Sequence, residues 1–296
     1  MLHLLEVQDF LQKAGRGELD SSRLDDLIEQ FGEDCKAAIK KQFSRNSGYS
    51  IRMSGLGRPL CQQTLEKQGM TQDVAYNDVM RFLIGDLIEA AAMLIMKGAG
   101  ITVTSEQESC SLELAGTTIN GTLDLVIEDD EGQKVWDVKS TSPWSFENKF
   151  SGRGGYDAIK SDDPFGYIMQ GYLYANSKDL PFGGWVAINK STGEWDFVEA
   201  PDEQQEDREE YMKEAVRRIE HLTSDADFKV PFQSLPETYT LKGEKIETGN
   251  RLMPKTCTFC SFKEHCWKNA ELHPKVTSKA KFPPMTWYTS IKVREM

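Results

Sequence analysis

The most constraining feature of this sequence is a long helical pattern that is followed at once by extended patterns. Apolar residues recur at helical intervals over 76–97, and extended runs with alternating apolar residues follow over 101–128. The sequence DDEG at 129–132 is typical of a tight turn, so 134–140 is predicted to return as the hairpin partner of the run before it. Helices around such a hairpin indicate an α/β fold, with a mixed β-sheet core flanked by helices.

Patterns on both sides extend this core. A helical N-terminal region is predicted over 1–48, and further helices over 164–175 and 203–222. A strand pair is predicted within 184–200, and the sequence after 222 reads as irregular. The predicted parts of one compact domain are a helical region (1–50), a core (51–250) and a cysteine segment with a tail (251–296).

The net charge argues against one way of binding nucleic acid. The chain carries 47 Asp and Glu against 35 Lys and Arg, a formal net charge of −12. This argues against a broad basic coat that holds nucleic acid by counterion release alone, although a cleft can still be locally positive. The surplus is uneven, since 202–210 is almost entirely acidic or amide and 263–296 is rich in lysine. Both stretches are interpreted as solvated surface.

The sequence contains no segment that predicts a membrane protein. Its start lacks a basic n-region, and the most apolar run, 87–96, is short and contains Glu89. We therefore expect a cytoplasmic protein without membrane contact. In that compartment clustered cysteines indicate metal binding rather than disulfides.

Two carboxylates and a lysine are predicted to meet on the hairpin. Residues two apart in a strand share a face, so Asp137 and Lys139 should lie side by side while Trp136 points into the core. A turn centred on 130–131 places Asp124 roughly opposite Asp137. Two adjacent carboxylates repel unless a divalent cation lies between them, and Mg²⁺ or Mn²⁺ suits such ligands. Such a metal with a nearby lysine can hydrolyse a phosphodiester, whereas a plain surface Asp–Lys pair is the alternative interpretation.

A third carboxylate lies on the long predicted helix. Arg81, Gly85 and Glu89 are four residues apart and share one stripe. Glycine at 85 would allow the stripe to approach the sheet closely. A glutamate among apolar residues needs a partner, for which a metal ion and Arg81 are both candidates.

In this order the motifs resemble those of the PD-(D/E)XK nuclease superfamily, in its RecB-like branch. The matching residues are Gly85 and Glu89, Gly121 and Asp124, Asp137-Val138-Lys139, and Gln170 with Tyr174. The resemblance covers about residues 51–268 and implies a restriction-endonuclease-like fold. It further implies that Glu89, Asp124, Asp137 and the Val138 carbonyl hold Mg²⁺ or Mn²⁺, that Lys139 assists the attacking water, and that Gln170 and Tyr174 position DNA. The first ligand is often His in this branch and is Glu89 here.

Three of the six cysteines form a tight C-terminal group. Cys257, Cys260 and Cys266 have the spacing C-x₂-C-x₅-C, which is typical of a metal site in an intracellular chain. The residues alone leave zinc open, with His265 as an alternative ligand. They also leave open which of Cys35, Cys61 and Cys110 is a fourth ligand.

Iron–sulfur members of the RecB-like branch, such as AddB-type and CRISPR-associated exonucleases, place one cysteine before the nuclease core and three after it. This resemblance implies that Cys61 joins Cys257, Cys260 and Cys266 as ligands of a [4Fe–4S] cluster. The cluster would connect positions about two hundred residues apart, so we expect a structural clasp. Cys110 is then expected in the core and Cys35 on a helix, without a special role.

Taken together, the motifs predict a metal-dependent DNA exonuclease that acts on single-stranded ends. The stretch 141–163 supports this, because basic residues alternate there with Trp144, Phe146 and Phe150, although a mobile surface loop is the alternative. Lys190 is a weaker candidate for a DNA contact. No P-loop motif is present, so any helicase or recombination partner would be a separate chain. The other hypotheses are a nuclease subunit of a repair or CRISPR-adaptation complex, a homo-oligomer, and a DNA-binding iron–sulfur protein with little activity.

Overall fold

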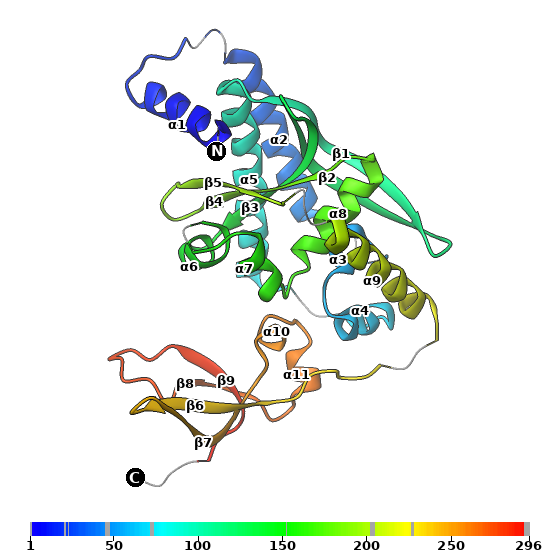
Figure 1. Cartoon of the computed structure of the whole chain (residues 1–296), viewed down its shortest axis with the longest axis vertical. Helices are drawn as coiled ribbons and strands as arrows, with labels where there is room; N and C mark the ends of the chain where they lie inside the picture. The colour runs from blue at the N-terminus through cyan, green and yellow to red at the C-terminus, as the bar shows by residue number, and fades with distance from the viewer. Residues whose placement is uncertain are drawn as a thin grey trace. The chain divides into compact units, whose positions relative to one another are not determined.

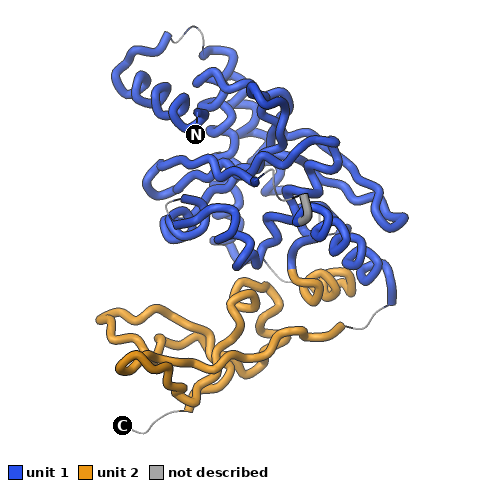
Figure 2. Tube along the Cα trace, in the orientation of Figure 1, with its two compact units in different colours: residues 1–58, 73–225 blue, residues 59–72, 226–296 orange. Residues whose placement is uncertain are grey.

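The structure is a computed structural model that describes residues 2–20, 22, 24–44, 48–71, 74–151, 153–201, 205–225 and 228–292. The chain forms two compact units, coloured separately in Figure 2. Unit 1 holds residues 1–58 and 73–225, and unit 2 holds 59–72 and 226–296. This division differs from the single compact domain that the sequence analysis expected. The predicted acidic stretch 202–210 and the lysine-rich tail fall partly outside the described residues, at 202–204 and 293–296.

The N-terminal region is helical, as its sequence predicts. It contains α1 (Leu2–Gly15) and α2 (Asp25–Phe43), and the long helix predicted over 76–97 is α5 (Tyr76–Gly98). Helix α2 has Asp25 and Asp26 in its first turn and Lys40 and Lys41 in its last, which complements the helix dipole at both ends.

A five-stranded mixed sheet forms the core of unit 1, which establishes the α/β class. Its spatial order is β1-β2-β3-β4-β5, with β3 and β4 parallel and the other neighbours antiparallel. The strands are β1 (Thr102–Leu114), β2 (Thr117–Asp129), β3 (Gly132–Thr141), β4 (Phe182–Asn189) and β5 (Trp195–Glu199). The parallel pair requires a crossover, and this connection carries α6 (Pro143–Ser145), η2 (Phe146–Phe150), α7 (Tyr156–Ser161) and α8 (Tyr167–Lys178). The stretch 141–163, for which a mobile surface loop was the alternative interpretation, therefore contains helical segments.

Helices cover both faces of this sheet (Figure 1). On one face, Val7 of α1 and Met93 and Met96 of α5 form a buried cluster with Trp136 and Val138 of β3. On the other face α8 packs across β1 to β4 and buries most of its residues. The alternation of strand side chains thus sends Trp136 and Val138 toward α5, and Asp137 and Lys139 toward α8.

Close backbone contact fixes the start of α8. A Cβ atom on Gly57 would lie 2.5 Å from the Cα of Gly166, and Gly166 has a φ of +75°, so both positions favour glycine. Gly57 follows the short helix α3 (Met53–Leu56). Helix α9 (Gln205–Thr223) contributes Arg218, whose Nη1 donates to the carbonyl oxygens of Leu56 and Arg58 at 3.0 and 2.7 Å.

Unit 2 contains a second sheet where the sequence analysis expected irregular chain. Its order is β6-β7-β9-β8, and all its neighbouring strands are antiparallel. Its elements are α4 (Leu60–Lys67), β6 (Leu235–Leu241), β7 (Glu244–Leu252), α10 (Lys255–Thr258), α11 (Lys263–Cys266), β8 (Glu271–Pro274) and β9 (Met285–Ser290). Among the described residues, no helix is both long and apolar enough to span a membrane.

Candidate functional site

The β2–β3 hairpin brings Asp124 and Asp137 together, as the turn chemistry predicts. The register pairs Leu125 with Trp136, so the next residues toward the open end of the hairpin are Asp124 and Asp137. Oδ2 of Asp124 accepts a hydrogen bond from the backbone N–H of Val138 at 2.8 Å. Val138 is 8% exposed with its side chain in the core, so only its backbone lies at this site.

The negative charge of the two carboxyl groups, those of Asp124 and Asp137, is only partly balanced by positive charge. Asp137 is 1% exposed, and its ion-pair partner among the described residues is the single ammonium group of Lys139. Burial raises the pKa of Asp137, and the Lys139 ammonium opposes this. Burial also raises the pKa of Asp124 well above its usual value, and the charges of Glu89 and Asp137 add to the effect. Buried carboxyls with raised pKa values are a feature of functional sites.

Lys139 faces the carboxyl pair from the same strand. Its Nζ lies 2.5 Å from Oδ2 of Asp137, 3.5 Å from Oε1 of Gln170, and 4.6 Å from the ring centre of Tyr167. Burial alone would lower the pKa of Lys139, but Asp137, Tyr167 and Asp124 outweigh it and hold the pKa above its usual value. Lys139 is therefore a fixed cation. Sequence reasoning missed Tyr167, although it lies three residues before Gln170 on the same helix face.

Glu89 reaches the site from α5, and Arg81 is not its partner. Arg81 pairs instead with Asp78 at 2.7 Å, and Nε2 of Gln107 on β1 donates to Oε1 of Glu89. Burial raises the pKa of Glu89 to about 7, Lys41 opposes the shift, and Asp137 adds to it. Gln107 has a φ of +45°, and neither it nor Lys41 carried a motif that could have marked it in the sequence.

The two motif glycines differ in their structural roles. A Cβ atom on Gly121 would lie 2.5 Å from Cε1 of Tyr174, so the tyrosine ring packs directly over this glycine. At Gly85 the nearest atom, Oγ of Ser140, would be 3.9 Å from the Cβ atom, an ordinary contact. Glycine is therefore not required at position 85 for the approach of α5 to the sheet, whereas the contact of Tyr174 with β2 does require glycine at position 121.

Most of the DNA-binding candidates of 141–163 have other contacts. Phe146 and Phe150 are buried, and Lys149 pairs with Asp162 at 3.1 Å. Lys160 pairs with Asp207 at 2.6 Å. In the same stretch the aromatic Trp144 and the basic Arg153 are exposed, as is Lys190 in the β4–β5 turn.

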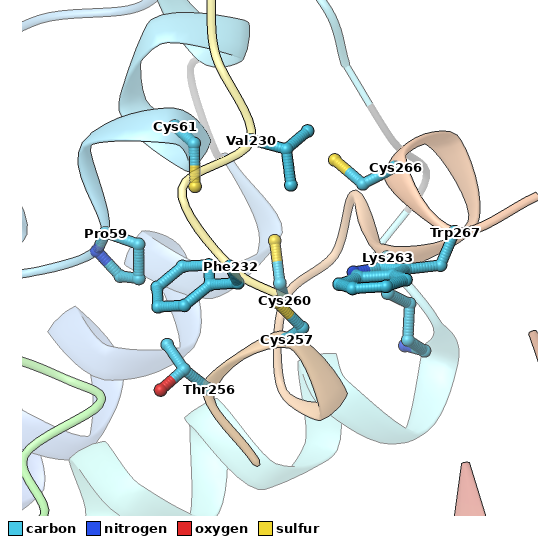
Figure 3. A pocket seen from close by; sticks show the side chains of 10 residues that line it. All are labelled: Pro59, Cys61, Val230, Phe232, Thr256, Cys257, Cys260, Lys263, Cys266 and Trp267. Atoms are coloured by element: carbon cyan, nitrogen blue, oxygen red, sulfur yellow. The ribbon is translucent and has the colours of Figure 1, made fainter. Parts of the chain in front are cut away.

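Four cysteines line one pocket in unit 2 (Figure 3). Cys61 is in the first turn of α4, and Cys257, Cys260 and Cys266 come from α10, α11 and the turn between them. Burial raises the pKa of Cys61 to about 11, and the other three cysteines add to this, so all four thiols interact. Cys35 and Cys110 belong to unit 1, where Cys35 is on α2 and Sγ of Cys110 contacts Sδ of Met53 at 3.9 Å.

N–H groups approach the sulfurs of this pocket. The backbone N–H of Phe262 donates to Sγ of Cys260 at 3.4 Å, and the backbone of Gln62 hydrogen-bonds Cys61. Nε1 of Trp267 is buried without an oxygen or nitrogen acceptor among the described residues, and it interacts with Cys257. Such donors stabilise thiolates, so the set fits a group held by four cysteine sulfurs. His265 is exposed beside the ring of Phe228.

In neither candidate site, the carboxylates of unit 1 or the cysteines of unit 2, do the side chains of the predicted ligands meet around one point. In the described part of the chain, no three His, Cys, Asp or Glu side chains lie close enough together to hold a metal ion. In unit 1 the two aspartates interact directly, whereas Glu89 is turned to Gln107. Lys139 is the ion-pair partner of the buried Asp137 carboxylate, and a carboxylate of this kind is nevertheless a ligand that suits a divalent cation.

Comparisons with known proteins leave the family open. No family model matches the sequence, and no curated protein matches it. Among solved structures, one titled "Crystal structure of SSO0001" aligns with 64% of this chain and 84% of its own, at 14% identity and a TM-score of 0.37. A similarity this low supports no inference about this chain.

Proposed function

We propose that this chain is a metal-dependent DNA exonuclease of the RecB-like PD-(D/E)XK type, with a restriction-endonuclease-like fold in unit 1. The observation that carries the proposal is the contact of Asp124, Asp137 and Lys139 on adjacent strands. The nearby Gln170 belongs to the helix that crosses from β3 to β4. These are the residues that the sequence motifs single out, and they come from separate parts of unit 1.

The residues present have distinct tasks in phosphodiester hydrolysis. Water loses a proton and forms a bond to phosphorus while the ester P–O bond breaks, the leaving oxygen takes up a proton to become a hydroxyl, and negative charge grows on the phosphoryl oxygens in between. Lys139 remains protonated because its pKa is held above the usual value, so it offsets this charge and orients water rather than acting as a base. Glu89, Asp124, Asp137 and the Val138 carbonyl would hold Mg²⁺ or Mn²⁺, which polarises the phosphoryl group and lowers the pKa of water.

Unit 2 is proposed to hold a [4Fe–4S] cluster on Cys61, Cys257, Cys260 and Cys266. Four thiols around one pocket, with N–H donors at three of their sulfurs, support this assignment. Because α4 and the C-terminal segment are far apart in the sequence, the cluster would fasten them to each other. Purified protein should be brown and contain iron and sulfide, whereas colourless protein with zinc would contradict the cluster.

The direct test uses labelled linear and circular single-stranded DNA with Mn²⁺, Mg²⁺ or EDTA, and anaerobically purified protein. Metal-dependent loss of the linear strand with the circle spared is expected of an exonuclease. Cleavage of both would indicate an endonuclease at the same site. If neither DNA is cut while the cluster is intact, the proposal that this chain alone is a nuclease is overturned.

Lys139→Ala tests the site itself. The variant should lose cleavage by about two orders of magnitude or more, as when a charge-stabilising donor is removed, while iron content and DNA binding stay unchanged. Lys134→Ala is the matched control, since this lysine is on the same strand but pairs with Glu131. Undiminished cleavage by Lys139→Ala would refute its role.

A further inference from the structure

Unit 2 carries a groove whose polar lining is basic. The groove, of about 480 Å³, lies beside the cysteine pocket, because Cys266 and Trp267 line both. Arg251, His265 and Lys268 line it together with polar groups such as those of Ser234 and Asn269. No acidic residue is among the described residues that line it. Glu264 and Glu271 flank residues 265–270, which line the groove, but neither glutamate lines it.

The charge of unit 2 is opposite to that of the whole chain. Its residues include 13 Lys and Arg against 8 Asp and Glu, a formal charge of +5. Unit 1, with 22 against 39, carries −17. An anionic ligand of this acidic protein is therefore favoured electrostatically at unit 2.

Among the residues that the structure describes, no carboxylate forms an ion pair with the basic groups of the groove. No ion pair in the described part of the chain involves Arg251, His265 or Lys268. Nε of Arg251 donates to Oγ of Ser234 at 3.1 Å, and Nη2 donates to the Ser234 carbonyl oxygen. These two bonds orient the guanidinium and leave its other N–H donors for a ligand. Lys268 is exposed.

We infer that this groove binds the phosphate backbone of a single-stranded DNA segment. Guanidinium, ammonium, hydroxyl and amide donors are the groups that contact phosphate oxygens in nucleic-acid complexes. The Trp267 ring in the same lining adds an aromatic surface, which suits a strand with unpaired bases better than free phosphate. The inference rests on the proposed nuclease function, since it adds a substrate contact outside the catalytic unit.

The test is DNA binding by the full chain with its cluster, in EDTA so that no strand is cut. Fluorescein-labelled oligothymidine is titrated at several salt concentrations with wild type, Arg251→Gln and Lys268→Gln. The plot of log affinity against log salt concentration has a negative slope, and each lost phosphate contact should make this slope shallower by about 0.7. Affinity at low salt should fall several-fold. The matched control is Lys279→Gln, an exposed lysine of unit 2 outside the groove, which should bind like wild type.

The outcomes separate this inference from the proposed function. If both groove variants keep the wild-type slope while the wild type cleaves DNA, only the inference is overturned. If binding depends on the groove but no metal supports cleavage, the proposed function fails and the inference stands. Because Arg251→Gln also removes the Ser234 contacts, absorbance of the cluster and thermal unfolding are recorded for each variant. If Arg251→Gln does not fold, the binding data of Lys268→Gln decide whether the inference holds. Wild type that binds inorganic polyphosphate but not the oligonucleotide would also overturn the inference.

Discussion

At the scale of single residues, Gly121 shows how a missing side chain shapes the candidate site. The ring of Tyr174 occupies the space that a Cβ atom at position 121 would need, and Met53 also crowds it, with Sδ 3.1 Å from that atom. Gly121→Ala should therefore destabilise the protein by about 1–3 kcal/mol through overpacking, and it should displace Tyr174. Urea unfolding measures the first effect, and loss of cleavage is expected to accompany it.

Gly85→Ala is the control for that substitution, since it adds the same methyl group to the other motif glycine. Its Cβ atom would meet only ordinary contacts, and Gly85 lies inside α5. Alanine there should stabilise the helix by about 0.5–1 kcal/mol. Equal destabilisation by both substitutions would contradict the distinct role of Gly121.

Glu89 gives the protein a dependence of stability on pH. Its pKa is raised to about 7 in the folded protein, against 4.5 ordinarily. Between these values the unfolded chain has released a proton that the folded protein keeps, so the free energy of unfolding falls as pH rises from 4.5 to 7. In EDTA, Glu89→Gln should be more stable than wild type at pH 8 by on the order of 1–3 kcal/mol, and similar at pH 4.5. Urea unfolding at both pH values measures this, and an equal difference at both would refute it.

Sequence reasoning found the residues of the site that follow local periodicity. The two-residue repeat of a strand and the turn before it place Asp124, Asp137 and Lys139 together. Gln107 and Lys41 could not be predicted from the sequence, because these residues approach Glu89 through packing between elements that no short motif records.

At the scale of elements, the C-terminal strands show why pattern reading failed in unit 2. The strands β6 to β9 contain Pro236 and Pro274, and their side chains are mostly exposed, so apolar alternation is weak. A buried carboxylate helps to hold them together instead. Glu237 is 1% exposed and accepts hydrogen bonds from Tyr288 Oη at 2.6 Å, Asn250 Nδ2 at 2.8 Å and Thr248 Oγ1 at 2.9 Å.

Glu237→Gln should destabilise unit 2 by roughly 2–3 kcal/mol at pH 7, because an amide cannot accept from all of these donors. Burial alone would raise the pKa of Glu237, but the donors outweigh it and lower the pKa. The stabilisation is therefore present above about pH 4.5 and is lost as pH falls through the lowered pKa. Unfolding at pH 7 and at pH 3 measures it, with the exposed Glu247→Gln of β7 as control. A difference that persists undiminished in acid would contradict this assignment.

The chain enters unit 2 twice. Residues 59–72 belong to it although they interrupt unit 1, and among them Cys61 is the residue that the sequence analysis assigned to the C-terminal cysteines. The α/β class could be predicted from periodicity, whereas the division into two units could not, because it depends on contacts between segments far apart in the sequence.

The proposed cluster would offset the entropic cost of holding these two segments together. Closing a loop of the roughly two hundred residues between Cys61 and Cys257 costs about 5 kcal/mol. Cys61→Ala should therefore lose iron and speed hydrogen exchange in 59–72 and in 255–268, while the sheet of β1 to β5 keeps its protection, because its strands pair within unit 1. Cys110→Ala, which removes a thiol of unit 1, should keep its iron. If Cys61→Ala retains full iron and unchanged exchange, the fourth ligand is a different group and α4 is held in unit 2 by packing alone.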